Sequence, residues 1–207
     1  MRDVVTGTVF GTLLNFRGEV EALGEKVNQP PYKAPPRAPV LYIKPANTWS
    51  ADGAEIPVPA NVPQVEVGAT IAMVMKAPGE VAGYVLMNDF SVPHASLFRP
   101  PVRHKCLDGF LGVGGKLLAR SGAVEPSKFV VEVRVNGELK QTVDFGNLVR
   151  GPERLLGDVS EFMTLDAGDV LMLGCDVGRP LAKVGDRIEI SAPGLGKLTN
   201  TLVAEAP

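Results

Sequence analysis

Cysteine and histidine are scarce in this sequence, with two of each among 207 residues. Cys106 and Cys175 lack the spacing of a CxxC motif, and a disulfide-built scaffold requires more cysteines than this. His94 and His104 lie ten residues apart, without Cys, Asp or Glu at the spacing of a structural zinc site. These absences argue against a disulfide framework and a zinc centre, and we expect a reducing, cytoplasmic environment.

An excess of positive charge and a long hydrophobic run are also missing. The formal net charge is −2, whereas surfaces that bind nucleic acid or anionic membranes need clustered Lys and Arg. No run approaches the roughly 20 apolar residues of a membrane span. Thr and Gly interrupt the first 16 residues, which we interpret as a strand rather than a signal peptide. We expect neither a nucleic-acid partner nor a membrane location.

Turn-forming residues, in contrast, are abundant. The 23 glycines and 18 prolines require short elements joined by many turns, which favours a β-rich domain. The five prolines between 28 and 39 exclude a regular helix or a central strand there, because proline lacks an N–H and fixes φ. We predict a mainly β (α+β) fold with short helices. Residues 1–39 would form a strand, a short helix and a proline-rich lid or linker of looser chain, and 40–207 the main domain.

The apolar pattern predicts the individual elements. Residues 129–145 alternate on either side of Asn136-Gly137, which indicates a hairpin with a type I′ turn. Residues 151–169 contain the best helix, with an apolar face of Leu155, Leu156, Val159, Phe162 and Met163. Strands are expected at 4–16, 40–45, 67–75 and 81–89 and after the Gly-Asp turns at 167–169 and 184–186, with one short helix at 18–27.

Two familiar catalytic motifs are not met. LGVGGK at 111–116 fails as a phosphate-binding loop, because Phe110 replaces its first glycine and Leu117 follows the lysine. We interpret it as a glycine-rich turn between strands. There is no GxSxG motif, and neither Ser91 nor Ser96 has a base that the sequence makes evident.

Charged residues stand where apolar segments end, notably Lys44, Asp89, Lys105 and Asp108. Taken singly, each is more typical of a solvated rim. Their joint pattern is more informative, because it is embedded in a recognisable order of motifs.

That order resembles the fumarylacetoacetate hydrolase family. The matching stretches are YIKPANTW, AGYVLMNDFS, RHKCLDGFLGVGG, VNGELKQ, SEFMTLDAGDVLMLG and VGDRIEISAPGLGKLTNTLV. The resemblance runs from about Gly11 to Val203 and implies a mixed β-roll or sandwich like the C-terminal domain of the family. Within the family, YKAPPRAPVLYIKPANTW is most similar to the amino-terminal half or subunit of the bifunctional decarboxylase/isomerases of 4-hydroxyphenylacetate (homoprotocatechuate) degradation.

The resemblance implies a chemistry and a set of partners. In the family, Mg²⁺ or Mn²⁺ held by carboxylates binds a 2-oxo or enol oxygen and stabilises an enolate. A lysine adds positive charge, and a His/Glu pair on a mobile N-terminal segment handles protons or water. The implied substrate is a small 2-oxo or 2-hydroxy dienoic diacid. The implied assembly is a homo-oligomer, or a hetero-oligomer with a paralogous half.

The family metal site is incomplete here. Asp89 matches the aspartate ligand, but the Glu-x-Glu pair aligns with Gly68-Ala69-Thr70. One carboxylate cannot replace the charge that holds Mg²⁺ against its hydration shell. A metal is therefore doubtful in this chain, and a structural role for Asp89, accepting backbone N–H groups at a strand end, is at least as well supported.

The cationic part of the implied site persists. Lys105 and Asp108 match the family's Lys-x-x-Asp motif and Lys44 its lysine before proline, and we take these three as catalytic. Asn15, Phe16 and Gly174 match the substrate-binding segments of the family. In the lid, Glu19 stands in the place of the histidine and Ala22 in that of the glutamate, and Asp176 would repel a substrate carboxylate if it faced the pocket.

Three hypotheses follow from the resemblance. The leading one is a subunit of a 5-oxopent-3-ene-1,2,5-tricarboxylate decarboxylase and 2-hydroxyhepta-2,4-diene-1,7-dioate isomerase in aromatic catabolism, with a degenerate metal site. The second is a catalytically inert partner that helps a metal-binding paralogue to assemble. The third is a metal-dependent acylpyruvate hydrolase or oxaloacetate decarboxylase, with Glu66 or Glu80 as replacement ligands.

Overall fold

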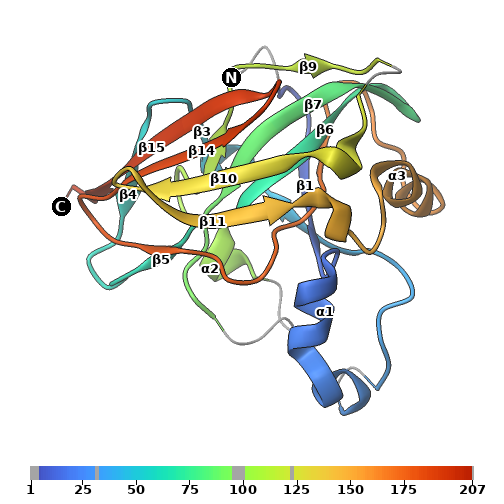
Figure 1. Ribbon diagram of the computed structural model, residues 1–207, viewed down its shortest axis with the longest axis horizontal. Coiled ribbons are helices and arrows are strands. Elements are labelled where there is room, and N and C mark those ends of the chain that lie inside the picture. The colour runs from blue at the N-terminus through green and yellow to red at the C-terminus, as the bar shows by residue number, and fades with distance from the viewer. Residues whose placement is uncertain (1–4, 31–32, 95–100, 122–123, 207) are drawn as a thin grey trace.

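The computed structural model describes residues 5–30, 33–94, 101–121 and 124–206, so that Val4 of the predicted first strand, and Ser96, lie outside them. The large sheet has eight strands in the order β2-β1-β12-β6-β7-β8-β3, with β9 paired to β7. Its antiparallel pair β6 and β7 lies side by side in Figure 1. Its strands are β1 (Val9–Leu13), β2 (Val40–Lys44), β3 (Trp49–Ala51), β6 (Ala69–Ala77), β7 (Glu80–Asp89), β8 (Leu111–Val113), β9 (Leu118–Ala119) and β12 (Val170–Met172).

A second sheet of five strands has the order β11-β10-β14-β15-β4, and β13 pairs with β5 in a separate ribbon. The strands are β4 (Glu55–Val58), β10 (Val130–Val135), β11 (Glu138–Asp144), β14 (Arg187–Ala192), β15 (Gly196–Ala204), β5 (Val65–Glu66) and β13 (Leu181–Ala182). The α-helices are α1 (Arg17–Leu23), α2 (Val102–Lys105) and α3 (Pro152–Ser160), and 3₁₀ turns cover Gly24–Asn28, Ala46–Thr48, Pro126–Lys128 and Phe145–Asn147. The predicted mainly β fold with short helices is confirmed.

The core explains why β6 and β7 are so uniformly apolar. Successive side chains of a strand point to opposite faces of the sheet. Ile71 and Leu86 pack, with Ile190 of the second sheet, into one large cluster, whereas Ala72 and Val85 belong to a second cluster on the other face. The central pair of strands is therefore buried on both faces, and the predicted segments 67–75 and 81–89 are confirmed as strands.

The predicted hairpin is confirmed. β10 and β11 pair antiparallel up to Val135 opposite Glu138. Asn136 and Gly137 between them have φ of 52° and 83°, and positive φ at both central residues is the mark of a type I′ turn. The predicted glycine-rich turn at 111–116 begins as strand β8, and only its later part is a connection.

Two helices are shorter than predicted. α3 buries Leu155, Leu156 and Val159 as expected, but it ends at Ser160, so Phe162 leaves the helical face and is 60% exposed. The assignment of Phe162 to the buried face was wrong for this reason. α1 ends at Leu23 because Gly24 adopts φ of 48°, and a 3₁₀ turn follows.

The first 40 residues are not loose throughout. β1 lies inside the large sheet between β2 and β12 and pairs with both. The proline-rich stretch that follows α1 has no regular element among its described residues, as predicted. The division of the chain at residue 39 remains a proposal. No helix in the described part of the chain is long and apolar enough to cross a membrane.

Candidate active site around Asp89

Asp89 is the last residue of β7 and is 1% exposed. Its N–H donates to the carbonyl of Gly68 over 2.8 Å, and Asp89 pairs with Leu111 of β8. Because β7 lies between β6 and β8, the backbone is fixed on both sides and holds the carboxylate in the interior. Such a buried charge must be paired and hydrogen-bonded to be tolerated.

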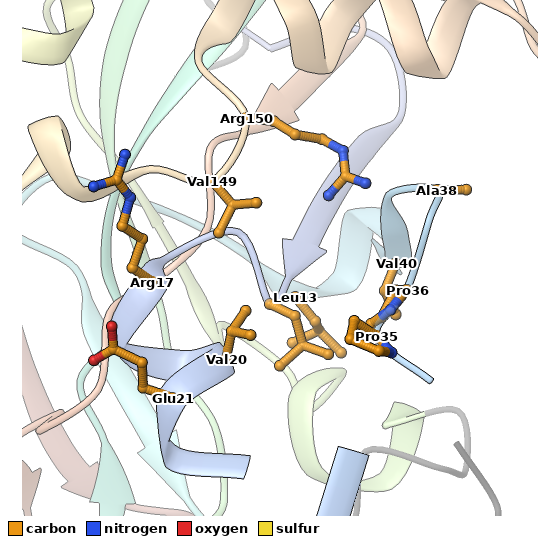
Figure 2. A pocket seen from close by; sticks show the side chains of 11 residues that line it. Leu13, Arg17, Val20, Glu21, Pro35, Pro36, Ala38, Val40, Val149 and Arg150 are labelled. Atoms are coloured by element: carbon orange, nitrogen blue, oxygen red, sulfur yellow. The ribbon is translucent and has the colours of Figure 1, made fainter. Parts of the chain in front are cut away.

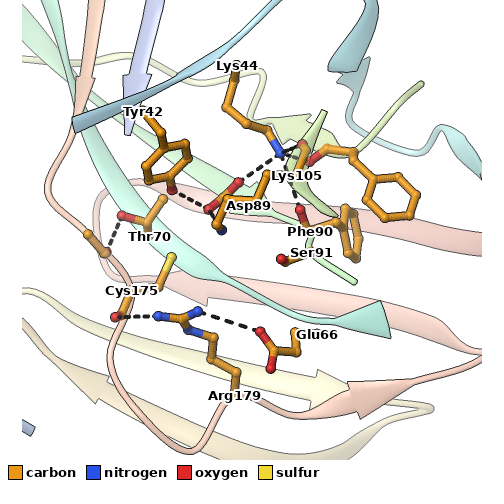
Figure 3. Close-up of polar contacts among 12 residues, drawn as sticks. Tyr42, Lys44, Glu66, Thr70, Asp89, Phe90, Ser91, Lys105, Cys175 and Arg179 are labelled. Atoms are coloured by element: carbon orange, nitrogen blue, oxygen red, sulfur yellow. Dashed lines mark hydrogen bonds and ion pairs between the residues drawn. The ribbon is translucent and has the colours of Figure 1, made fainter. Parts of the chain in front are cut away.

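Two lysines converge on this carboxylate (Figure 3). Lys105, at the end of α2, donates from Nζ to Asp89 Oδ2 over 2.6 Å, and Lys44 Nζ, at the end of β2, lies 2.9 Å from Oδ1. All three side chains are at most 2% exposed. The structure thus brings together Lys44, Lys105 and Asp89, three of the residues that the sequence singled out. We call them the Asp89 cluster.

Lys44 is held by backbone as well as by Asp89. Its Nζ donates to the carbonyl oxygens of Phe110 (2.7 Å), Phe90 (3.2 Å) and Lys105. An ammonium group has three donors, so these carbonyls can account for all of them. The position of Lys44 fits an anchor that joins β2, β7 and the end of α2.

Tyr42 completes the cluster and was missed in the sequence. Its hydroxyl donates to Asp89 Oδ2, and Lys105 Nζ lies 4.8 Å from the centre of its ring. Tyr42 precedes Lys44 by two positions on β2, so the period of a strand puts both side chains on one face. That spacing was the available signal. The expectation that Asp89 accepts backbone N–H groups was wrong, because its described donors are side chains.

The charges explain the direction of each pKa shift. Burial alone would raise the pKa of Asp89, but the ammonium groups of Lys105 and Lys44 outweigh it and hold this pKa well below the ordinary value. Burial, and then the negative charge of Asp89, raises the pKa of Tyr42 well above its ordinary range. Asp89 is therefore ionised and Tyr42 is a hydrogen-bond donor at neutral pH.

The residues around Asp89 do not fit a divalent cation. Mg²⁺ requires near-octahedral oxygen coordination, whereas both oxygens of Asp89 already face ammonium or hydroxyl groups. A Cβ at Gly68 would lie 2.3 Å from the carbonyl oxygen of Asp89, and Thr70 Oγ1 donates to the carbonyl of Gly174 over 2.6 Å. No group of three His, Cys, Asp or Glu that could hold a metal occurs among the described residues.

The two replacement ligands considered in the sequence are engaged elsewhere. Glu80 begins β7, which Asp89 ends, and it pairs with Lys76 at the surface over 2.7 Å. Glu66 lies on β5, where its Oε2 is 3.6 Å from Nη1 of Arg179. Neither arrangement gives Asp89 a second carboxylate in the position of a metal ligand.

A cavity of about 430 Å³ adjoins Arg179 and is partly covered by α1. It is lined by Leu14, Glu19, Ala22, Leu23, Glu66, His94, Val177, Gly178, Arg179 and Leu181. Arg179 Nη2 donates to the carbonyl of Cys175 over 3.2 Å (Figure 3), and a Cβ at Gly68 would lie 3.1 Å from Cys175 Sγ. Cys175 thus lies beside both Arg179 and Gly68, and burial raises its pKa to about 12, which keeps the thiol neutral.

Glu19 faces this cavity as a buried acid. Its Oε1 pairs with Arg179 over 2.6 Å, and its Oε2 is buried without a hydrogen-bond partner among the described residues. Burial raises the pKa of Glu19 although the charge of Arg179 opposes this. A carboxyl group with a raised pKa and an unbonded oxygen is suited to carry a proton. Arg179 was missed, since nothing in its local sequence distinguishes it.

The predicted substrate-binding residues form a tight structural contact. Asn15 donates from Nδ2 to the carbonyls of Leu173 (2.8 Å) and Arg150 (3.1 Å) and accepts from the N–H of Arg150 (3.0 Å). A Cβ at Gly174, where φ is 108°, would lie 3.4 Å from Asn15 and 3.6 Å from Phe16. Asn15 and Phe16 are fully buried and position the start of α1, while Leu14 reaches the cavity.

Other predicted residues lie outside the Asp89 cluster. Asp108 accepts from Asn47 Nδ2 over 2.7 Å, and its described contacts include none with Asp89. Asp176 accepts from the N–H of Val177 and does not line the cavity. His94 Nδ1 lies 2.9 Å from the carbonyl of Val92 and 3.5 Å from Ser91 Oγ, so its contacts do not single it out as a base for Ser91.

The β-rich scaffold agrees with that of one protein family. A model of the fumarylacetoacetate (FAA) hydrolase C-terminal family matches residues 8–203, and the chain belongs to this family. The 4-hydroxyphenylacetate degradation bifunctional isomerase/decarboxylase of Salmonella dublin is 38% identical over 96% of the chain, but the match covers 48% of that relative. The chain therefore spans about half the length of the bifunctional relatives that it matches.

Solved structures support the fold. A 5-carboxymethyl-2-hydroxymuconate delta-isomerase from Mycobacterium smegmatis is 25% identical, with a TM-score of 0.80 over 97% of this chain and 80% of the other. A fumarylpyruvate hydrolase from Pseudomonas aeruginosa, in complex with Mn²⁺ and pyruvate, is 21% identical, with a TM-score of 0.81 over 96% and 90% of the two chains. Proteins that share this fold or sequence thus include a bifunctional isomerase/decarboxylase, an isomerase and a hydrolase, and the structure of the hydrolase contains Mn²⁺.

Proposed function

We propose that this chain is one half of an isomerase/decarboxylase of aromatic catabolism that acts on a 2-oxo or 2-hydroxy dienoic diacid in the cytosol. We further propose that its own site works without a divalent metal. The observation that carries the proposal is the convergence of Lys44 and Lys105 on Asp89, the position of the family's metal ligand. The identity to bifunctional isomerase/decarboxylases supports the substrate class.

The charge arrangement favours isomerisation over loss of CO₂. Converting a 2-hydroxydiene into a 2-oxoene breaks the O–H bond and forms a C–H bond at the far end of the diene. Negative charge builds up on the oxygen meanwhile, and a fixed cation stabilises it. Lys105 would supply that charge, with Lys44 as its anchor, and Glu19 would accept and return the proton.

Access to Lys105 requires movement, because this lysine is 2% exposed. α1 is the element best suited to move. It has seven residues and no side-chain hydrogen bond at its N-cap, and it covers the cavity through Glu19 and Ala22. Short helices without caps are marginal in isolation. Asp108, Asn15, Phe16 and Gly174 would support this movement or the site around it rather than touch the reacting atoms.

The same burial favours a second candidate function, that of an inert partner. In that case the Asp89 cluster is a permanent internal ion network, and the chain helps a metal-binding paralogous half to assemble. Both candidates predict a complex between two halves, so binding alone cannot distinguish them.

Turnover with and without chelator separates the candidates. Conversion of 2-hydroxyhepta-2,4-diene-1,7-dioate would be followed by its absorbance, with this chain alone and with a metal-binding half, before and after EDTA. We expect conversion by this chain to survive EDTA and to fall at least about 100-fold in Lys105→Met, the magnitude typical of a lost electrostatic catalyst. Lys76→Met, at the surface, is the matched control.

The remaining outcomes are equally decisive. If this chain converts nothing but the metal-binding half fails without it, and Lys105→Met does not alter that dependence, the inert partner is the correct function. Saturable binding of Mg²⁺ or Mn²⁺ by calorimetry that is lost in Asp89→Ala would overturn the metal-free site.

A further inference from the structure

A second cavity, of about 220 Å³, lies on the other side of α1 (Figure 2). Helix periodicity places Arg17, Val20 and Glu21 on one face of α1 and Glu19, Ala22 and Leu23 on the opposite face. The first three line this second cavity and the last three line the cavity beside Arg179. Leu14, just before the helix, lines both. The second cavity is therefore distinct from the candidate active site but shares a wall with it.

The walls of this cavity are mainly apolar. They consist of Leu13, Leu14 and Val20, of Pro35, Pro36, Ala38 and Val40 on the opposite side, and of Val149, together with Arg17, Glu21 and Arg150. In Figure 2, Arg17 and Glu21 extend from α1 away from Pro35 and Pro36. Their charged ends thus lie at the outer rim rather than among the apolar groups.

Arg150 is the polar group that the cavity contains. Its side chain is 9% exposed. Its Nε donates to Asp158 over 2.8 Å and its Nη2 to the carbonyl of Arg37 over 2.8 Å. Nη1 has no described bond, and it is not among the buried unpaired atoms of the described residues. A guanidinium group that is fixed by two bonds and retains free donors is a preorganised site for a carboxylate.

The volume limits the size of the ligand. An engineered apolar cavity of about 150 Å³ accepts benzene. A cavity of about 220 Å³ therefore has room for one ring and a short acidic arm.

We propose that this cavity binds a monocyclic aromatic carboxylate. The ring packs between Leu13, Val20 and the two prolines, and the carboxylate accepts from Nη1 of Arg150. This inference does not depend on the proposed function, because it concerns a different cavity. The ligand would also brace α1, since Arg150 is bound through its backbone to Asn15 at the start of that helix.

Phenylacetate is a suitable probe, and phenylacetamide is its neutral counterpart of the same shape. Calorimetry on the full chain should show saturable binding of phenylacetate and at least tenfold weaker binding of the amide. Methyl NMR spectra should place the largest shifts at Leu13 and Val20. We expect Arg150→Gln to weaken phenylacetate binding at least tenfold.

Arg150→Gln also removes the ion pair with Asp158 and could weaken binding by disturbing the fold. Two further variants therefore test the cavity without changing that pair. Val20→Phe fills the cavity from the partly buried face of α1 and should abolish binding while leaving the dispersion of the NMR spectrum intact. Arg17→Gln removes a rim charge and should change the affinity less than threefold. Equal affinity for acid and amide, unchanged binding in Val20→Phe, or no saturation by about 10 mM phenylacetate would each overturn the proposal.

Discussion

Asp89 is ionised in the core because the ammonium groups of Lys105 and Lys44 lie against it, and the Tyr42 hydroxyl donates to it as well. Replacing it with asparagine would leave two buried ammonium groups without their counter-charge. Removing one partner of a buried ion pair costs about 3–5 kcal/mol, so we expect Asp89→Asn to lower the free energy of unfolding by this amount. Urea denaturation measures it. Glu80→Gln is the control, because its pair with Lys76 is solvent-exposed and should change stability by less than about 1 kcal/mol.

The hydroxyl of Tyr42 contributes separately. Tyr42→Phe keeps the ring against Lys105 and removes one donor to a buried carboxylate. Hydrogen bonds to charged groups contribute about 1.5–3 kcal/mol, and we expect a loss of stability in this range, again from urea denaturation. Tyr84→Phe is a matched control, because the Tyr84 ring is buried and its hydroxyl makes no described hydrogen bond. Equal losses in both variants would show that the bond to Asp89 contributes nothing.

Lys44 and Tyr42 show which residues of the candidate site could be predicted from the sequence and which could not. Lys44, Asp89 and Lys105 stood at the ends of apolar segments within recognisable motifs, and the structure brings them together. Tyr42 looks like an ordinary strand residue, and Arg179 like a loop residue. Their contacts, to Asp89 and to Glu19, cross 47 and 160 positions, and such distances follow from sheet order rather than from any local pattern.

At the scale of elements, the sequence predicted a turn correctly where the backbone conformation admits few residue types. The Asn136-Gly137 turn was predictable because few residues accept positive φ at adjacent positions. The end of α3 was not, because the segment after Ser160 continues an apolar pattern without a strong stop signal. Tertiary packing, not helical periodicity, determines where Phe162 lies.

Two glycines in these elements should respond oppositely to alanine. Gly137 has φ of 83° with no atom within 4 Å of an added Cβ, so Gly137→Ala tests backbone strain alone and should cost about 1 kcal/mol. Gly157 lies within α3 and is equally unobstructed, so Gly157→Ala should stabilise by about 0.5–1 kcal/mol. Thermal unfolding of both variants checks the signs, and a shift in the same direction would contradict the backbone argument.

At the scale of the whole molecule, the described chain forms two large sheets and a two-stranded ribbon, and it matches about half the length of its bifunctional relatives. The fold was predictable because strand patterns and family motifs cover nearly the whole chain. The metal question was harder, because the family resemblance implies that two ligands are replaced but the sequence does not show which groups face Asp89. In the structure the ammonium groups of Lys44 and Lys105 face its carboxylate, and this supports the proposed metal-free site.

Two buried acids, Glu19 and Asp89, should change the stability of the protein in opposite directions as the pH falls. The pKa of Glu19 is raised in the folded state, so the folded protein binds this proton first and stability should rise as pH falls from neutral towards 4.5. The pKa of Asp89 is lowered, so its contribution is complete above the ordinary value and should be lost as pH falls below about 4. Urea midpoints measured between pH 7 and pH 3 should pass through a maximum.

Two variants separate the contributions. Glu19→Gln should remove the rise in stability between neutral pH and pH 4.5 and keep the loss below about pH 4, whereas Asp89→Asn should be less stable at neutral pH and lose less stability in acid. Identical profiles for the wild type and Glu19→Gln above pH 4.5 would mean that Glu19 keeps its ordinary pKa, and would remove the basis for its role as the proton carrier.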